Sequence, residues 1–267
     1  MDEDRVIAVS PRHSVRLARE YVVLVDHAPM QDYVVRTITR REANGMPLMT
    51  AEIVIAGREA RERFPLAARY PLHFRKSYTS ARLHGDATVE LEAQRAAEKL
   101  VHVPPAIGAT ESTYRSCLVP GNPYPRVSPF GAEPDEANLR LAKEVSLAEA
   151  AGLWHLLEQA FSTLATLHDG GLAHGDAELH NFIVSPSPLE MVLIDYESVV
   201  RKSAVDDATW KARILADFAP LLKESIYVEV ALGRQEGPLA NAAHAAMSTL
   251  FKDPGRFERA IDDHDGF

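Results

Sequence analysis

The sequence predicts an α+β protein whose first half is mostly sheet and whose second half is mostly helix. Segments rich in β-branched and aromatic residues lie in 1–119, whereas stretches with helical periodicity fill 120–267. Between them, residues 120–134 hold a cluster of Pro and Gly, which is the clearest break in composition. We therefore expect an N-terminal lobe, 1–119, and a C-terminal lobe, 120–267, within one domain.

The length and composition are those of an ordinary globular protein. The chain has 267 residues, 46% hydrophobic and 25% charged, which suffices for one large domain or two lobes around one cleft. A formal net charge of −9 gives no global attraction to nucleic acid or anionic membranes, so we expect neither as a partner. With Cys117 as the single cysteine, an intramolecular disulfide is excluded. No signal-peptide pattern and no membrane-length apolar run occur, so we expect a cytoplasmic protein.

Several short segments of the N-terminal lobe predict strands, because they are rich in β-branched and aromatic residues. Asn44–Gly45 is a turn signal, so the strands on either side of it should form a hairpin. The strands that we expect are 21–25, 33–39, 48–56, 70–76 and 113–119.

One long helix is expected in this lobe, over residues 87–101. Apolar residues recur there at helical spacing, and Pro104–Pro105 would stop the helix. Asp86 stands directly before it and suits the N-cap position.

Helices should dominate the C-terminal lobe. Two follow the Pro-rich stretch, and the second begins at a capping box formed by Ser146 and Glu149. Its apolar stripe from Leu153 to Leu167 predicts one buried face. Two strands and further helices complete the lobe, at 182–184, 191–194, 207–225, 226–232, 238–251 and 256–262.

The residues that carry chemistry lie in the predicted catalytic loop and hairpin of residues 172–197. This stretch contains H-G-D-A-E-L-H-N, a Ser/Pro turn between two strands, and I-D-Y-E. Phosphoryl transfer needs a carboxylate beside the acceptor hydroxyl and hard oxygen ligands for Mg²⁺. Asp176 suits the first role. Asn181 and Asp195 suit the second, because a hairpin would bring both to the same end.

These motifs resemble the catalytic loop and metal-binding motif of the protein-kinase-like superfamily in its H-G-D form. The H-G-D form is similar to that of aminoglycoside and choline kinases, and a compact C-terminal lobe with a minimal activation segment resembles Rio-like atypical protein kinases. The resemblance implies a bilobal kinase-like fold with a β-rich N-lobe, a mainly helical C-lobe and a nucleotide cleft between them. It also implies ATP and Mg²⁺ as cofactors, Asp176 as the catalytic residue, and Asn181 and Asp195 as nucleotide and metal ligands.

The same resemblance implies a cation and a carboxylate in the N-terminal lobe. Lys76 ends a predicted strand and is expected to contact the α- and β-phosphates. A helical Glu should pair with that lysine, and we choose Glu92. The alternatives are Arg75 and Arg58 for the cation, and Glu90 and Glu98 for the carboxylate.

A hinge for adenine is implied by Y-R-S-C-L-V-P-G, which resembles the hinge segment of kinases. Cys117 and Val119 are the expected backbone contacts, with Ser116 near the gatekeeper position. A brace for the catalytic loop is expected from Asp206, Asp207 or Asp217, and a plain helix N-cap is an equal alternative for the first two. His174 is expected to pack and hydrogen-bond within the loop.

Two features depart from the pattern of the family. Only Gly57 stands between the candidate strands where a glycine-rich loop is usual. Glu178 lies two residues after Asp176, where related families carry a cation that faces the γ-phosphate, and His180 is the residue that could replace it. The acceptor that we favour is a protein Ser or Thr; the alternatives are a small hydroxylated molecule, or a pseudokinase that binds nucleotide without transfer.

Overall fold

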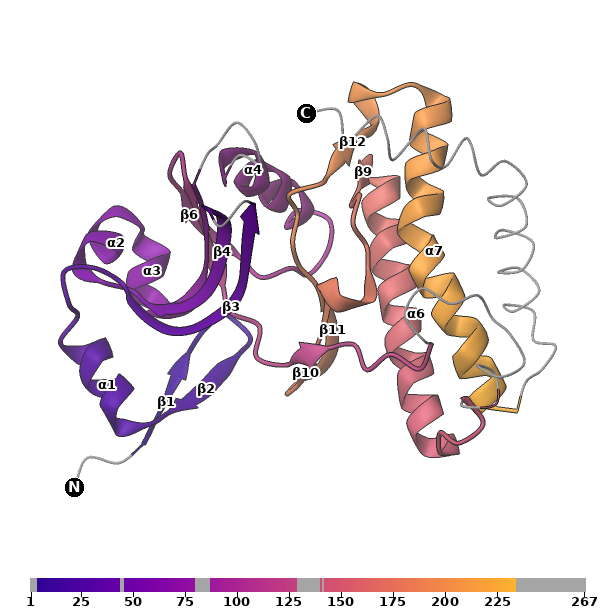
Figure 1. The fold of residues 1–267 in the computed structure, drawn as a ribbon, viewed down its shortest axis with the longest axis horizontal. Helices are drawn as coiled ribbons and strands as arrows, with labels where there is room; N and C mark the ends of the chain where they lie inside the picture. The colour runs from indigo at the N-terminus through magenta and orange to yellow at the C-terminus, as the bar shows by residue number, and fades with distance from the viewer. Residues whose placement is uncertain (1–3, 44–45, 80–86, 129–139, 141, 234–267) are drawn as a thin grey trace. The chain divides into compact units, whose positions relative to one another are not determined.

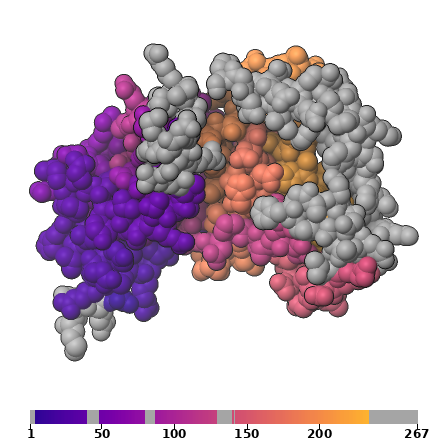
Figure 2. All heavy atoms as spheres, viewed as in Figure 1, coloured from indigo at the N-terminus to yellow at the C-terminus, as the bar shows by residue number. Residues whose placement is uncertain are grey.

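The computed structural model describes residues 4–43, 46–79, 87–128, 140 and 142–233, which appear in colour in Figures 1 and 2. The protein is of the α+β class, as expected. The chain divides into two compact units, which are described separately. Unit 1 comprises Met1–Gly121, Ser185–Leu189 and Ile194–Glu197. Unit 2 comprises Asn122–Val184, Glu190–Leu193 and Ser198–Phe267.

The centre of unit 1 is an antiparallel five-stranded sheet in the order β3-β4-β5-β7-β6. The hairpin expected around Asn44–Gly45 is confirmed by the pairing of β3 with β4, although the turn itself lies outside the described residues. The expected strands at 70–76 and 113–119 are also confirmed, with slightly shifted ends. The strands are β3 (Tyr33–Ala43), β4 (Met46–Ile55), β5 (Leu72–Tyr78), β6 (Ala106–Ala109) and β7 (Thr113–Cys117).

Helix α4 (Ala87–Ala97) packs on one face of this sheet (Figure 1). Side chains alternate between the two faces of a strand, so every second residue of β5 and β7 faces the helix. Tyr78, Ala87 and Tyr114 are buried in the cluster that joins the helix to the sheet. The expected helix is therefore confirmed over most of its length, while its predicted N-cap, Asp86, lies outside the described residues.

The opposite face of the sheet is covered by α2 (Arg58–Arg63) and α3 (Pro65–Arg69), which connect β4 to β5. Ala60, Ala67 and Cys117 belong to the apolar cluster on this side. The stretch around Gly57 is thus the start of a helical connection between the two strands.

The strand predicted at 21–25 is wrong, because this segment is the helix α1 (Arg19–Asp26). Tyr21, Val22, Leu24 and Val25 pack into one apolar cluster, whereas Val23 between them is 50% exposed. That pattern has helical spacing, and tertiary packing overrides the strand propensity of a β-branched run. The helix follows a hairpin of β1 (Arg5–Ala8) and β2 (Ser14–Leu17).

Unit 2 is built on two long helices that pack against each other, α6 (Leu147–Asp169) and α7 (Asp207–Ala231) (Figure 1). The Ser146 side chain caps α6 by accepting a hydrogen bond from the Glu149 N–H, as the capping box predicts. The expected break near residue 225 is wrong, since α7 continues through it. Within the helix, the Ser225 hydroxyl donates to the Leu222 carbonyl at 2.8 Å.

Short strands follow α6 along the chain and form the predicted hairpin, of which Ser185–Leu189 belong to unit 1 and the rest to unit 2. β10 (Phe182–Pro186) lies between β11 (Leu189–Leu193) and β8 (Asn122–Pro123) in a three-stranded sheet. A second pair joins β9 (Leu172–Ala173) to β12 (Val200–Arg201), ahead of the 3₁₀ turn η2 (Lys202–Ala204). The helices predicted at 238–251 and 256–262 lie outside the described residues. Among the described helices, none has the length and apolar character needed to cross a membrane.

Candidate functional site

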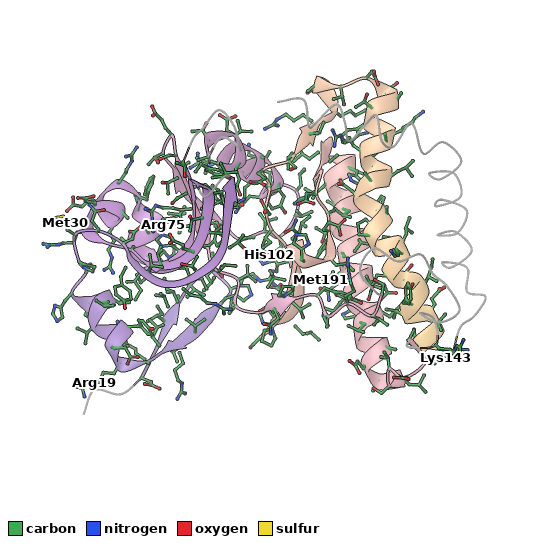
Figure 3. All side chains as sticks on the ribbon, in the orientation of Figure 1. Arg19, Met30, Arg75, His102, Lys143 and Met191 are labelled. Atoms are coloured by element: carbon green, nitrogen blue, oxygen red, sulfur yellow. The ribbon has the colours of Figure 1, made fainter. Side chains whose placement is uncertain are left out.

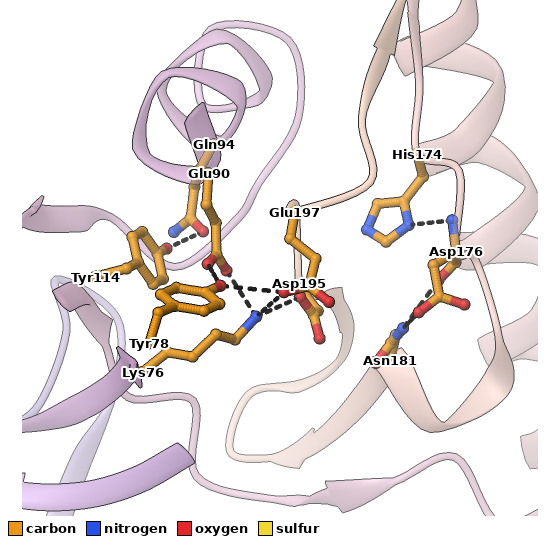
Figure 4. A network of polar contacts seen from close by, with 10 residues as sticks. All are labelled: Lys76, Tyr78, Glu90, Gln94, Tyr114, His174, Asp176, Asn181, Asp195 and Glu197. Carbon is orange, nitrogen blue, oxygen red and sulfur yellow. Dashed lines mark hydrogen bonds and ion pairs between the residues drawn. The ribbon is translucent and has the colours of Figure 1, made fainter. Parts of the chain in front are cut away.

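Lys76 is the centre of a buried polar cluster in unit 1 (Figure 4). Its position on β5 places its side chain on the same face as Tyr78, two residues further on. The ammonium nitrogen Nζ lies 3.1 Å from Oε1 of Glu90, 2.7 Å from Oδ1 of Asp195 and 3.1 Å from Oε2 of Glu197. Lys76 is only 2% exposed, so these contacts replace most of its hydration.

The expected pairing of Lys76 with Glu92 is wrong, since Glu90 makes this ion pair. Glu90 is 1% exposed, whereas Glu92 lies on the solvent face of α4. The two glutamates lie two positions apart on the same helix. Residues at this spacing point to opposite sides of a helix, so only one of them can face Lys76. The Tyr78 hydroxyl supports the pair by donating to Oε2 of Glu90 at 2.7 Å.

The electrostatics of this cluster follow from three carboxylates around one ammonium. Burial lowers the pKa of Lys76, but the charges of Glu90, Asp195 and Glu197 outweigh it and raise the pKa above its ordinary value. Burial raises the pKa of Glu90 to about 7, although Lys76 acts against this rise. The cluster therefore keeps Lys76 charged, with more carboxylates than cations around it.

Asp195 has an unusual backbone conformation for a residue with a side chain. It lies just after β11, and its backbone dihedral angle φ is 67°. Among the described residues other than glycine, no other has a positive φ. Such strain tends to occur at functional sites, where the surrounding structure holds it. Here the ion pair with Lys76 holds the side chain in unit 1.

In unit 2, the catalytic-loop candidates Asp176 and Asn181 are hydrogen-bonded to each other (Figure 4). Nδ2 of Asn181 donates to Oδ2 of Asp176 at 3.0 Å and to its backbone carbonyl at 2.9 Å. Asn181 ends the 3₁₀ turn η1 (Leu179–Asn181), directly before β10, and is 4% exposed. Its amide nitrogen therefore orients the Asp176 carboxylate, and its amide oxygen is the atom that could serve as a metal ligand.

The loop is braced by Asp217, which projects from α7 and is 1% exposed. Its carboxylate accepts hydrogen bonds from the backbone N–H groups of His174 at 2.7 Å and Gly175 at 2.8 Å. It also lies 2.8 Å from Nε2 of His168. Of the three aspartates considered for this role, Asp217 thus provides the brace, while Asp206 is the N-cap of α7.

Gly175 lets the chain turn between His174 and Asp176. Its φ is 83°, a left-handed conformation that side chains disfavour. An added Cβ would also overlap with the carbonyl oxygen of Ser198. Within the loop, His174 accepts the Asp176 N–H at Nδ1 at 3.3 Å, so its buried ring supports the loop as expected.

The hinge assignment of Cys117 and Val119 stays a prediction, and the structure shows which backbone donors of this segment are already used. The Cys117 N–H is already bonded to the Pro105 carbonyl at 2.9 Å, so it cannot donate to a base. The Leu118 N–H bonds to the Val9 carbonyl at 3.3 Å. The Val119 N–H has no partner among the described residues and stays the expected donor. Burial raises the pKa of the Cys117 thiol to about 12.

Arg75, an alternative to Lys76, is labelled in Figure 3. It stands one residue before Lys76 on β5, so its side chain is on the other face of the sheet, where it belongs to a separate polar cluster. It pairs with Asp32 at 2.7 Å and Glu52 at 2.6 Å. Arg115 shares Asp32 and lies 2.9 Å from Nε2 of the buried His73. Arg75 therefore faces away from Glu90 and Asp195, and Lys76 remains the candidate phosphate ligand.

The metal assignment rests on Asn181 and Asp195 and stays a prediction. In the described ranges, no three side chains of His, Cys, Asp or Glu converge as a ready-made metal site. Mg²⁺ in nucleotide sites is commonly held by one or two carboxylates together with the phosphates. Asp195 and Glu197 supply such carboxylates in unit 1.

The predicted site did not include Tyr78 or Glu197 among its residues. The sequence held a signal for both, because Tyr78 lies two residues after Lys76 on a strand and Glu197 lies two residues after Asp195.

A scan against protein-family models gives no match for this chain, and a search among curated proteins gives none either. An account of its function therefore rests on these side chains.

Proposed function

We propose that the protein is an ATP-dependent phosphotransferase with a bilobal kinase-like fold, which moves the γ-phosphate of Mg·ATP to a hydroxyl group. The observation that carries this proposal is the buried Lys76–Glu90 ion pair. Lys76 stands on the third strand, in chain order, of the five-stranded sheet, and Glu90 stands on the helix that follows. Protein kinases use a lysine of their third strand, paired with a glutamate of the next helix, to hold the nucleotide phosphates.

Each residue then has a role that suits its chemistry. Lys76 binds the phosphates, and Asp195 holds Mg²⁺ together with Asn181, with Glu197 as a further carboxylate in unit 1. Bound Mg²⁺ neutralises charge on the phosphates. Asp176 orients the acceptor hydroxyl and takes its proton, and its carboxylate is held for this purpose by Asn181.

We favour a protein Ser or Thr as the acceptor, because the stretch from the hinge to Asp176 is short for helices that would enclose a small substrate. A small hydroxylated molecule is the alternative within the same reaction. Nucleotide binding without transfer is the second candidate function, and the observation that favours it is the acidic Glu178 in the catalytic loop.

The test is incorporation of labelled γ-phosphate from Mg·ATP by the full chain, with itself, a lysate or small alcohols as acceptors. Asp176→Asn should keep nucleotide affinity and lower turnover by about 10²–10⁴-fold. Asp169→Asn, an exposed aspartate of the same unit, is the matched control and should leave turnover unchanged. Equal transfer by wild type and Asp176→Asn would refute the role of Asp176.

A second variant tests the nucleotide site of unit 1. Asp195→Asn should remove the Mg²⁺ dependence of ATP binding, because an amide is a weaker ligand for Mg²⁺ than a carboxylate. A thermal unfolding scan shows whether this variant folds. Unchanged, Mg²⁺-dependent affinity for ATP would contradict the assignment of Asp195.

A further inference from the structure

The catalytic loop of unit 2 carries two carboxylates close together in sequence, Asp176 and Glu178. Glu178 is the N-cap of η1, and its carbonyl accepts the Asn181 N–H at 2.9 Å, so it belongs to the same tight turn as Asp176. Transfer of a phosphoryl group brings further negative charge to such a loop. A cation is therefore needed beside it to offset the repulsion.

Arg126 supplies a cation at this position. Its Nη2 atom lies 3.5 Å from Oε2 of Glu178. The Arg126 side chain is 18% exposed and that of Glu178 is 44% exposed, so the guanidinium is the more enclosed of the two. His180, the replacement cation that the sequence suggests, lies on the exposed side of η1.

The backbone on the N-terminal side of Arg126 is fixed to the strand that follows the catalytic loop. β8 pairs with Ile183 and Val184 of β10. The Tyr124 N–H donates to the Phe182 carbonyl at 2.8 Å. Arg126 is therefore held two residues from a backbone contact with the loop's own continuation.

The backbone on the C-terminal side of Arg126 is fixed by a buried carboxylate of α7. Glu224 is 0% exposed and accepts the N–H groups of Val127 at 2.5 Å and Ser128 at 3.0 Å. Burying a carboxylate costs free energy unless it is hydrogen-bonded, and here two backbone donors satisfy it and tie this short segment to α7. Rigid placement is what a group needs if it is to stabilise charge that develops during a reaction.

We propose that Arg126 is the cation that binds the transferring phosphoryl group, and that Glu178 orients it. This inference rests on the phosphotransferase function proposed above. A guanidinium has five N–H donors in a planar fork, so it can pair with Glu178 on one side and with phosphate oxygens on another. In the transfer, the acceptor oxygen bonds to the γ-phosphorus while the bond to the bridging oxygen breaks, with its electron pair leaving on ADP. Asp176 takes the hydroxyl proton, and Arg126 keeps its own.

If the Arg126–Glu178 pair were a partly exposed ion pair without function, its loss would change little. If Arg126 binds the phosphoryl group, its loss should weaken the binding of a nucleotide that carries a γ-phosphate. The measurement is the affinity of the full chain for Mg²⁺ with a non-hydrolysable ATP analogue, compared with Mg·ADP, by calorimetry. Arg126→Gln should weaken binding of the analogue about tenfold, the value of one lost charged hydrogen bond, and that of ADP by less than about twofold. Arg201→Gln, an exposed arginine of unit 2, is the matched control and should change neither.

A rescue variant tests the charge itself. Glu178→Lys combined with Arg126→Gln places a cation directly on the loop and should restore most of the preference for the analogue over ADP. If Arg126→Gln unfolds at a lower temperature, Glu178→Gln decides instead, because releasing Arg126 should reduce the same preference. An unchanged ratio of affinities in these variants, or equal loss for both nucleotides, overturns the inference. Failure of the wild type to bind either nucleotide overturns the proposed function itself.

Discussion

Lys76 and Glu90 form an ion pair of 3.1 Å in which both side chains are at least 98% removed from solvent, at 2% and 1% exposure. Breaking a buried pair leaves the remaining charge without water or partner, which is among the costlier single changes in a protein. In this cluster Asp195 and Glu197 also contact Lys76, so part of the neutralisation survives the loss of Glu90.

We therefore expect Glu90→Ala to lower the free energy of unfolding by about 2–4 kcal/mol. This is somewhat less than the loss of about 3–5 kcal/mol that is usual when one partner of a buried ion pair is removed. Glu92→Ala on the exposed face of the same helix should change it by less than about 0.5 kcal/mol. Urea unfolding of both variants measures the difference. Equal effects at the two positions would show that the pair contributes nothing to stability.

The brace by Asp217 gives a second contrast. Asp217→Ala leaves the His174 and Gly175 N–H groups and the His168 ring without their acceptor in a buried site. Each unsatisfied donor costs about 1–3 kcal/mol, so we expect a loss of at least about 3 kcal/mol. Asp206→Ala, which removes an N-cap on the same helix, should cost only about 1 kcal/mol. Chemical denaturation decides, and a smaller loss at residue 217 than at residue 206 contradicts the brace.

Gly175 and Gly152 should respond in opposite directions to the same substitution. Gly175→Ala forces a side chain into a left-handed conformation and against the Ser198 carbonyl, so we expect a loss of at least about 2 kcal/mol. Gly152 lies at an exposed position of α6 with open space around it, so Gly152→Ala should gain about 0.5–1 kcal/mol, because alanine favours helices. Thermal unfolding of both variants checks the signs, and a neutral Gly175→Ala would refute the steric argument.

His73 predicts a pH dependence of stability. Burial, with Arg115 beside it, lowers the pKa of His73 from 6.5 to about 3. Arg115 can only donate, so Nε2 of His73 must accept and the ring stays neutral. Between about pH 6.5 and about pH 3 the unfolded chain binds a proton on His73 that the folded chain does not bind. The contribution of His73 to stability is therefore complete above about pH 6.5 and is lost as the pH falls.

From about pH 7 to about pH 5.5 this one group should lower the free energy of unfolding by about 1 kcal/mol. His73→Gln keeps an acceptor near Arg115 but cannot titrate, so its stability should fall less over this range than that of the wild type. His155→Gln, at an exposed position on α6, should follow the wild type. Parallel curves for wild type and His73→Gln, from urea unfolding at each pH, would exclude His73 as the source.

The sequence by itself determined the class of the fold and the positions of the local signals. β-branched and aromatic composition and a turn signal located the hairpin of β3 and β4, and a capping box located the start of α6, because these features depend on neighbours along the chain. The candidates Asp176, Asn181 and Asp195 could be named from their spacing along the chain, and Lys76 from what the resemblance of that motif implies.

Only the tertiary structure decided which side chains meet. Helical periodicity did not distinguish Glu90 from Glu92, because the choice depends on which face of α4 the sheet covers. The β-branched run at 21–25 became a helix because packing against a shared core outweighs local propensity. The contact of Arg126 with Glu178 joins residues far apart in sequence. The segment that carries Arg126 is held on one side by the pairing of β8 with β10 and on the other side by Glu224.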